Sequence, residues 1–287
     1  MSAAIYSARY KLDTLVLEGM EPGGQLGLTA RIENYPGVPG AVGADLASAM
    51  RQQMEESGAT VLPQSVRRAW KGEDGLIHVR TDSDEHSARF LMIATGAAPK
   101  RLGVPGEERL HGRGVSYCAT CDAPFFRDAL VMVVGGGDSA VKEAIHLAGY
   151  AKTVFLVHRR DKLRAEPVLA DRIGALENVE ILWSSNLVEI HGESSVEAVT
   201  VRRSGETGRM EMDGVFLYVG RKPATDPFGS LVDLNEDGTV RTTDNVRTSN
   251  PQVVAAGDVT DNGLRQIVTA VGDGARAATA VYESLEG

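Results

Sequence analysis

Apolar residues in this chain form short runs that alternate with helix-like stretches and with turns rich in glycine and proline. The clearest run is Leu130–Val134 (L-V-M-V-V), and its unbroken apolar character is typical of a strand buried on both faces of a parallel sheet. A helical pattern follows over Ala140–Leu147, and a second apolar run follows at Thr153–Val157. This stretch predicts one complete strand–helix–strand unit.

The N-terminal pattern predicts only the second half of such a unit. Met1–Arg9 favours a helix that is already under way at Met1, and Leu12–Glu18 favours a strand after it. A loop is predicted at Pro22–Pro39, a helix at Ala44–Ser57 and a final helix at Gln266–Ser284. Short strands are predicted at Thr60–Pro63, Ala69–Trp70, Ile77–Thr81, Phe90–Ala94, Val179–Trp183, Leu187–Ile190, Val196–Arg202, Gly214–Val219 and Val253–Ala256.

The order of these elements predicts an α/β protein with two similar parts. Each part is a strand–helix unit followed by a β-meander, and the second part is inserted within the first. A chain of 287 residues fits two domains of about 150 residues each. A hydrophobic content of 43% is enough for packed cores.

Charge and hydropathy exclude several classes of partner. The net charge of −9 argues against nucleic acid as the main partner. No run approaches the roughly 20 apolar residues that span a bilayer, so no membrane partner is expected. The N-terminus has no basic-then-apolar export signal, which predicts a cytoplasmic protein with reduced thiols.

Cys118 and Cys121, the only cysteines, form a C-A-T-C sequence followed by Asp122. Two thiols at this spacing can form and break a disulfide within one turn, which is the working unit of dithiol oxidoreductases. The pair could also belong to a zinc site or be a pair of buried structural thiols. Zinc would need two more ligands, and the six histidines contain no close pair, so we favour redox use and expect no metal.

A nucleotide site is predicted directly after the apolar run at Leu130–Val134. The sequence G-G-G-D-S-A contains Gly135, Gly137, Asp138 and Ser139, with Ala140 at the third glycine position of the dinucleotide fingerprint. Such a turn places backbone N–H groups of a helix N-terminus against a pyrophosphate.

The end of the second strand indicates which nicotinamide cofactor binds. Enzymes selective for NAD place a carboxylate there, whereas those selective for NADP place arginine against the 2′-phosphate. This chain has a basic segment that contains His158, Arg159, Arg160 and Arg164. The segment predicts NADPH over NADH, with a solvated basic loop as the alternative.

The chain resembles the low-molecular-weight thioredoxin reductases of bacteria and archaea. The matching segments run in family order from one end of the chain to the other. They are G-G-Q-L (23–26), I-E-N-Y-P-G (32–37), I-A-T-G-A (93–97), G-R-G-V-S-Y-C-A-T-C-D (112–122), V-V-G-G-G-D-S-A (133–140), H-R-R-D-K-L-R-A (158–165), A-A-G-D-V (255–259) and R-Q (265–266).

The resemblance implies two Rossmann-like nucleotide-binding domains, each a three-layer ββα structure, of the class II pyridine nucleotide-disulfide oxidoreductase type. The FAD domain would be split into residues 1–104 and 222–287, and residues 105–221 would form the NADPH domain with the redox cysteines. Electrons would pass from NADPH through FAD and the Cys118–Cys121 disulfide to thioredoxin. The resemblance also implies a homodimer and an NADPH domain that rotates between two states.

Individual residues receive expected roles from the same resemblance. Cys118 would attack the substrate disulfide, Cys121 would lie next to the flavin, and Asp122 would be the general acid, with a helix N-cap as its alternative role. The residues expected at FAD are Gly24, Gln25, Asn34, Thr95, Gly96, Gly257, Asp258, Arg265 and Gln266.

The sequence departs from the family pattern at three places. The family begins with a strand and a glycine turn that hold the FAD pyrophosphate, whereas this chain starts within the helix that follows that turn. We expect a misassigned start, with a fragment or a natural loss as alternatives, and weak FAD binding or poor folding at this length. Ala123 stands where glycine is usual, and Lys142 stands where an acidic residue is common.

Two other functions stay open at this point. One is a flavin-dependent reductase or oxidase of another dithiol carrier. The other is a flavin-deficient remnant that binds NADPH without catalysis.

Overall fold

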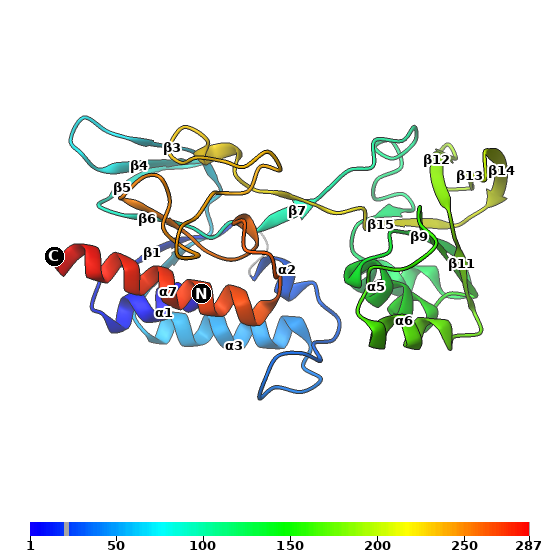
Figure 1. The fold of residues 1–287 in the computed structure, drawn as a ribbon, viewed down its shortest axis with the longest axis horizontal. Coiled ribbons are helices and arrows are strands. Elements are labelled where there is room, and N and C mark those ends of the chain that lie inside the picture. The colour runs from blue at the N-terminus through cyan, green and yellow to red at the C-terminus, as the bar shows by residue number, and fades with distance from the viewer. Residues whose placement is uncertain (20–22, 287) are drawn as a thin grey trace. The chain divides into compact units, whose positions relative to one another are not determined.

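The computed structural model describes residues 1–19 and 23–286. The chain divides into two compact units (Figure 1). Unit 1 contains residues 1–98 and 222–287, and unit 2 contains residues 99–221. The chain passes between them at β7 (Ala97–Pro99) and β16 (Arg221–Pro223), two short strands that pair with each other.

Unit 2 is built on one five-stranded sheet in the order β11-β10-β9-β15-β8. Its strands are β8 (Val115–Ser116), β9 (Leu130–Val134), β10 (Thr153–Val157), β11 (Val179–Leu182) and β15 (Gly214–Leu217). Each neighbouring pair is parallel. β9 is the central strand, and β15 runs parallel to it. The connections that follow these two strands therefore leave the sheet at the same edge, where such sheets bind nucleotides.

Two layers cover the faces of this sheet. Helices α5 (Asp138–Ala148) and α6 (Pro167–Gly174) enclose one buried cluster with β9 and β10, and the meander β12 (Ser185–His191), β13 (Ala198–Arg203) and β14 (Glu206–Glu211) encloses another. Alternating residues of β9 explain the two clusters, since Val131 and Val133 belong to the first and Met132 and Val134 to the second. The sheet is therefore buried on both sides.

Unit 1 contains the same kinds of element in shorter sheets. β1 (Leu15–Leu17) pairs in parallel with β2 (Thr60–Leu62), and β6 (Leu91–Ile93) pairs in parallel with β17 (Val253–Ala255). An antiparallel meander contains β3 (Val66–Lys71), β4 (Ile77–Thr81) and β5 (Glu85–Ala88). The remaining helical turns among the described residues are α2 (Gly24–Gly27), α4 (Ala119–Asp122), η1 (Ala123–Phe126), η2 (Asp226–Phe228) and η3 (Gly257–Val259).

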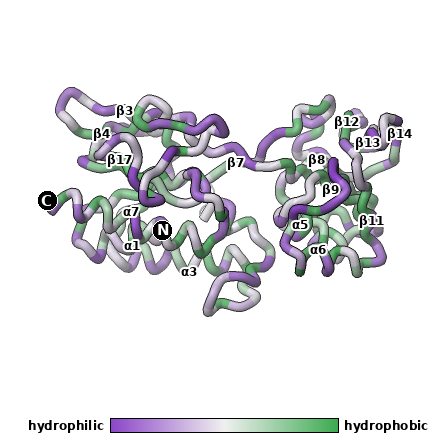
Figure 2. Tube along the Cα trace, in the orientation of Figure 1, coloured by the Kyte–Doolittle hydropathy of each residue, from purple (hydrophilic) through white to green (hydrophobic). Residues whose placement is uncertain are grey.

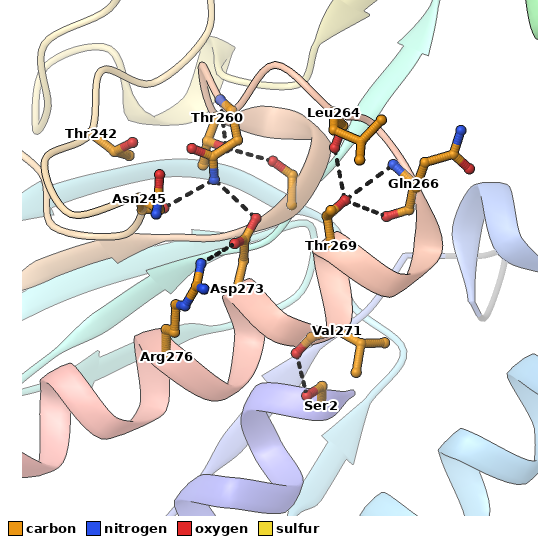
Figure 3. Close-up of polar contacts among 12 residues, drawn as sticks. Ser2, Thr242, Asn245, Thr260, Leu264, Gln266, Thr269, Val271, Asp273 and Arg276 are labelled. Carbon is orange, nitrogen blue, oxygen red and sulfur yellow. Dashed lines mark hydrogen bonds and ion pairs between the residues drawn. The ribbon is translucent and has the colours of Figure 1, made fainter. Parts of the chain in front are cut away.

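Three helices pack side by side in unit 1: α1 (Ser2–Arg9), α3 (Gly43–Glu56) and α7 (Ile267–Glu286) (Figure 1). The first and last helices of the chain are held together by specific contacts. Ser2 Oγ donates to the carbonyl of Val271 at 2.8 Å, as Figure 3 shows, and Tyr10 stacks on Tyr282 at 4.4 Å between ring centroids. The two ends of the sequence thus share one layer.

The pattern of apolar residues predicted the buried elements closely. β9 and β10 have the predicted bounds, and α1, α3, α5 and α7 lie within two residues of theirs at each end. The connection between β3 and β4 is largely hydrophilic (Figure 2), whereas the sequence predicted only Ala69–Trp70 of β3 and no strand at β5. No helix in the described residues is long and apolar enough to cross a membrane.

Other elements differ from the prediction because tertiary packing forms them. The predicted loop at Pro22–Pro39 contains α2 at Gly24–Gly27, and its first residue lies outside the described range. The apolar pattern contains no signal for β14, whose residues are mostly exposed, because this strand is paired to β13 by backbone hydrogen bonds rather than by an apolar face. The short helix α6 begins with Pro167 and follows a basic loop, which concealed its two buried residues.

Candidate redox and nucleotide-binding site

The two cysteines form a disulfide at the start of a short helical turn. Cys118 is the N-cap residue of α4, and its Cα lies 5.4 Å from that of Cys121. The backbone N–H of Cys121 donates to Cys118 Sγ at 3.2 Å, and the N–H of Asp122 donates to the Cys118 carbonyl at 3.2 Å. Cys118 is half-buried and Cys121 is exposed. An N–H group that points at one sulfur favours the thiolate form of that sulfur once the disulfide is reduced.

Asp122 lies at the junction of two helical turns. It is the last residue of α4 and the N-cap residue of η1, and its side chain makes no capping hydrogen bond. The side chain is half-buried. The alternative role of side-chain N-cap is therefore not seen in this structure.

Tyr218 and Glu143 hold the redox turn, and sequence reasoning missed both. Tyr218 Oη accepts the backbone N–H of Ala119 at 2.7 Å, and Glu143 Oε2 accepts the hydroxyl of Thr120 at 3.3 Å. Burial raises the pKa of Glu143 to about 7. Burial also raises the pKa of Tyr218 above its ordinary value, so this phenol keeps its proton. Glu143 follows the helical pattern one residue after Lys142, and only the tertiary structure shows that it reaches the cysteine turn.

Glu107 is a second buried acid near the turn. It is 2% exposed, and its carboxylate accepts the N–H groups of Leu102, Gly103 and Val104 as well as the hydroxyl of Tyr117. These bonds fix the segment that leads into unit 2. Within the described residues, no group of three or more His, Cys, Asp or Glu side chains could hold a metal ion.

The glycine turn after β9 has no room for side chains at two positions. A Cβ on Gly135, which has φ +156°, would lie 2.6 Å from the carbonyl oxygen of Tyr218, and a Cβ on Gly136 would lie 2.2 Å from the ring of His158. Gly137 is the N-cap residue of α5 and supplies no side-chain acceptor, and the space at its Cβ is open. The first N–H groups of α5 are thus left for an anion.

Asp138 and Ser139 begin α5, and Asp138 joins the turn to the basic segment. Asp138 Oδ1 accepts the backbone N–H of Glu166 at 2.9 Å, while Ser139 is exposed. The backbone N–H of Arg164 donates to the Gly136 carbonyl at 2.7 Å. The structure therefore brings the predicted glycine turn and the predicted basic segment together.

His158 differs from the three arginines in its surroundings. It is 4% exposed, and its Nε2 hydrogen-bonds the carbonyl of Lys162 at 3.0 Å. Burial lowers its pKa, so the ring is neutral near pH 7. Arg159 and Arg160 are exposed and Arg164 is largely so, and in the described part of the chain none of them forms an ion pair with a carboxylate.

The residues expected at FAD all lie in unit 1, on segments far apart in the sequence. Asn34 Nδ2 donates to Gln266 Oε1 at 3.0 Å, which joins positions 232 residues apart. Thr95 Oγ1 donates to the carbonyl of Ala224 at 2.8 Å, beside Gly96, which has φ +65°. Gly24 and Gln25 lie on α2, and Gly257 and Asp258 lie on η3. Arg265 is exposed just before α7.

Thr269 and Asp273 organise the start of α7, beside Gln266. Thr269 Oγ1 contacts the carbonyls of Leu264 and Gln266, at 2.7 and 2.8 Å (Figure 3). Asp273 is 4% exposed, accepts the amide of Asn262 at 2.9 Å and faces Arg276. These contacts fix the loop that carries Arg265 and Gln266, and sequence reasoning did not identify them.

Comparison with known proteins identifies the class. The sequence matches the pyridine nucleotide-disulphide oxidoreductase family over residues 1–274. That class fits a protein with a redox disulfide beside a nucleotide turn on a parallel sheet.

Individual relatives narrow the identification. The chain is 42% identical over 293 residues to a thioredoxin reductase of Bacillus subtilis (strain 168), covering 100% of this chain and 91% of the relative. It is 44% identical over 290 residues to that of Listeria innocua, covering 100% and 90%. The crystal structure of Lactococcus lactis thioredoxin reductase superposes with a TM-score of 0.95 at 40% identity, covering 98% of this chain and 94% of that one. The chain belongs to the pyridine nucleotide-disulphide oxidoreductases and, within them, to the thioredoxin reductases.

Proposed function

We propose that this protein reduces the disulfide of thioredoxin with NADPH, through FAD and the Cys118–Cys121 pair. The observation that carries the proposal is the disulfide between the only two cysteines, in the same unit as a glycine turn and an arginine-rich segment. Membership of the thioredoxin reductases supports flavin and NADPH use. We also propose a cytoplasmic homodimer, as the family resemblance implies.

The residues of unit 2 fit NADPH. The tight turn at Gly135 and Gly136 and the open N-terminus of α5 suit a pyrophosphate, and Asp138 and Ser139 line the same helix start. Arg159, Arg160 and Arg164 would bind the 2′-phosphate through guanidinium groups. His158 would act indirectly, because its buried ring supports Gly136 rather than facing solvent.

The residues of unit 1 fit FAD. Gly257 has φ +75°, and a Cβ there would lie 3.3 Å from Cβ of Ala270, so glycine lets η3 pack closely against α7. Gln25, Asn34, Asp258, Arg265 and Gln266 would supply polar contacts, and Gly24, Thr95 and Gly96 would supply backbone contacts. When bound, FAD would accept a hydride from NADPH and pass the electron pair on to the disulfide.

The cysteine turn would carry out the protein's own part of the reaction. After reduction, the Cys118 thiolate would attack the thioredoxin disulfide, forming a mixed disulfide and releasing a thiolate, which Asp122 would protonate. Cys121 would then attack Cys118 Sγ, which releases reduced thioredoxin and restores the Cys118–Cys121 bond. The N–H of Cys121 favours a thiolate at Cys118 rather than at its partner.

Phe125 supplies an apolar contact for a protein substrate. It is 83% exposed and follows Cys121 by four positions. An exposed aromatic side chain beside a reactive pair is typical of a docking point.

Separate half-reactions test the proposal. In Cys118→Ser and in Cys121→Ser, we expect thioredoxin reduction to be abolished while NADPH still reduces bound flavin at close to the wild-type rate. The first measurement is the absorbance of bound flavin after purification, because a chain that does not bind flavin would contradict the proposal. Equal loss of both half-reactions would contradict the assigned electron path, and reduction of another dithiol carrier but not thioredoxin would contradict the substrate.

A further inference from the structure

The cysteine turn is held by groups from two other elements of unit 2. Glu143 comes from the middle of α5, and Tyr218 comes from the segment after β15. Neither is in the set of residues implied by the family motifs. Both contact the residues between the cysteines, since Tyr218 binds the N–H of Ala119 and Glu143 binds Thr120.

The hydrogen-bond donors of this turn point to two places: to side chains of other elements and to Cys118 itself. The N–H of Ala119 and the side chain and backbone of Thr120 are directed to Tyr218 and Glu143. The N–H groups of Cys121 and Asp122 are directed to the sulfur and carbonyl of Cys118. After reduction, the Cys118 thiolate would lie on this turn, and an ionised Glu143 would contact the same turn from α5.

The charges around Glu143 make its protonation variable near neutral pH. Burial raises its pKa to about 7, and hydrogen bonds from Thr120 and the positive charges of Arg221 and Lys142 oppose that rise. Burial raises the pKa of the Tyr218 hydroxyl, and the negative charges of Glu143 and Asp122 raise it further. Lys142 lies on the same helix, whereas Arg221 lies on β16, Tyr218 directly after β15 and Asp122 on α4.

We propose that Glu143 is a positioning residue for the redox turn, which fixes the Thr120 backbone and, when ionised, opposes formation of the Cys118 thiolate. The proposal rests on the proposed function insofar as Cys118 is the attacking thiol. Tyr218 has the complementary role, because it fixes the Ala119 N–H without carrying a charge. Glu143 binds Thr120, two residues from Cys118, and like-charge repulsion raises the energy of the state in which both groups are ionised.

The thiol pKa of Cys118 tests the proposal without cofactor or substrate. The full chain with Cys121→Ser leaves one thiol, whose alkylation by iodoacetamide is followed by mass spectrometry from about pH 5.5 to about pH 9.5, which brackets the ordinary thiol pKa. We expect Glu143→Gln in this background to lower the thiol pKa by about one unit, since one nearby opposing charge is removed. An unchanged thiol pKa would overturn the proposal.

Matched variants separate charge from structure. Glu180→Gln removes an exposed carboxylate from β11 of the same unit and is expected to leave the profile unchanged. Tyr218→Phe is expected to change the alkylation rate through a looser turn while leaving the thiol pKa in place. A shift as large in either variant as in Glu143→Gln would contradict a role for the Glu143 charge.

If Glu143→Gln does not fold, the Cys121→Ser chain that keeps Glu143 provides a second measurement. With Glu143 present, the alkylation profile is expected to need two ionisations, that of the thiol and that of Glu143 at about 7. A profile described by the thiol alone would overturn the proposal. If the alkylation profiles are as expected but the wild-type protein does not reduce thioredoxin, only the proposed function is contradicted.

Discussion

Units 1 and 2 contain similar elements, and they differ in how the sheet is assembled. Unit 2 has five parallel strands in one ladder with a buried cluster on each face. Unit 1 has two separate parallel pairs and a core divided among three clusters. Two-stranded pieces are marginal alone, so unit 1 depends on contacts between segments that are remote in the sequence.

This difference also separates the two candidate sites. In unit 2 the cysteine turn, the glycine turn and the basic segment lie within 47 consecutive residues, Cys118–Arg164. In unit 1 the expected flavin residues extend from α2 to the start of α7, and their alignment depends on bonds such as that between Asn34 and Gln266. A local change should therefore damage unit 2 locally, whereas unit 1 should respond to changes at distant positions.

The largest effect is expected from the centre of unit 2. Phe216 is fully buried in β15 and meets Phe126 edge-on at 5.2 Å, so Phe216→Ala should cost about 3–5 kcal/mol of unfolding free energy. The chain has one tryptophan in each unit, Trp70 and Trp183. The Trp70→Phe background leaves Trp183 to report the unfolding of unit 2 in urea, and the Trp183→Phe background leaves Trp70 to report unit 1. The loss of stability should appear in the transition that Trp183 reports. Equal displacement of both transitions would show that the units unfold together.

The next effect concerns the basic segment. Arg159→Ala with Arg160→Ala should weaken NADPH binding about 100-fold, because two charged hydrogen-bond donors to a phosphate are lost. NADH binding should change by less than about threefold, since it lacks that phosphate. Titration of the full chain with both nucleotides checks this, and bound flavin in unit 1 should be unaffected. An unchanged preference for NADPH would contradict the phosphate assignment.

A smaller effect depends on pH and on Glu143. Burial raises its pKa from 4.5 to about 7, so between these values the folded chain keeps a proton that the unfolded chain releases. Its contribution to stability is present below pH 4.5 and is lost as the pH rises through about 7. Glu143→Gln should therefore gain about 2 kcal/mol relative to wild type on going from about pH 5 to about pH 8. Urea unfolding followed at Trp183 measures this, and a constant difference would contradict the raised pKa.

The smallest effect is expected from a long-range bond in unit 1. Asn34 is exposed, so Asn34→Ala should cost only about 1 kcal/mol of stability while removing the bond to Gln266. Flavin retention after gel filtration should fall more than stability does. Asn186→Ala, an exposed position in β12 of unit 2, is the matched control and should leave retention unchanged. Equal retention in both variants would contradict a flavin contact at Asn34.

The sequence by itself determined the buried strands and the reactive residues of unit 2. Continuous apolar runs at β9 and β10, the glycine turn and the cysteine pair are local signals, because strand burial, tight turns and disulfide spacing each depend on neighbouring residues. Only the tertiary structure decided that Glu143 and Tyr218 support the cysteine turn, that His158 lies buried under Gly136, and that Asn34 meets Gln266. Such contacts join residues between 22 and 232 positions apart. Their geometry follows from how sheets and helices pack, which no local pattern of residues records.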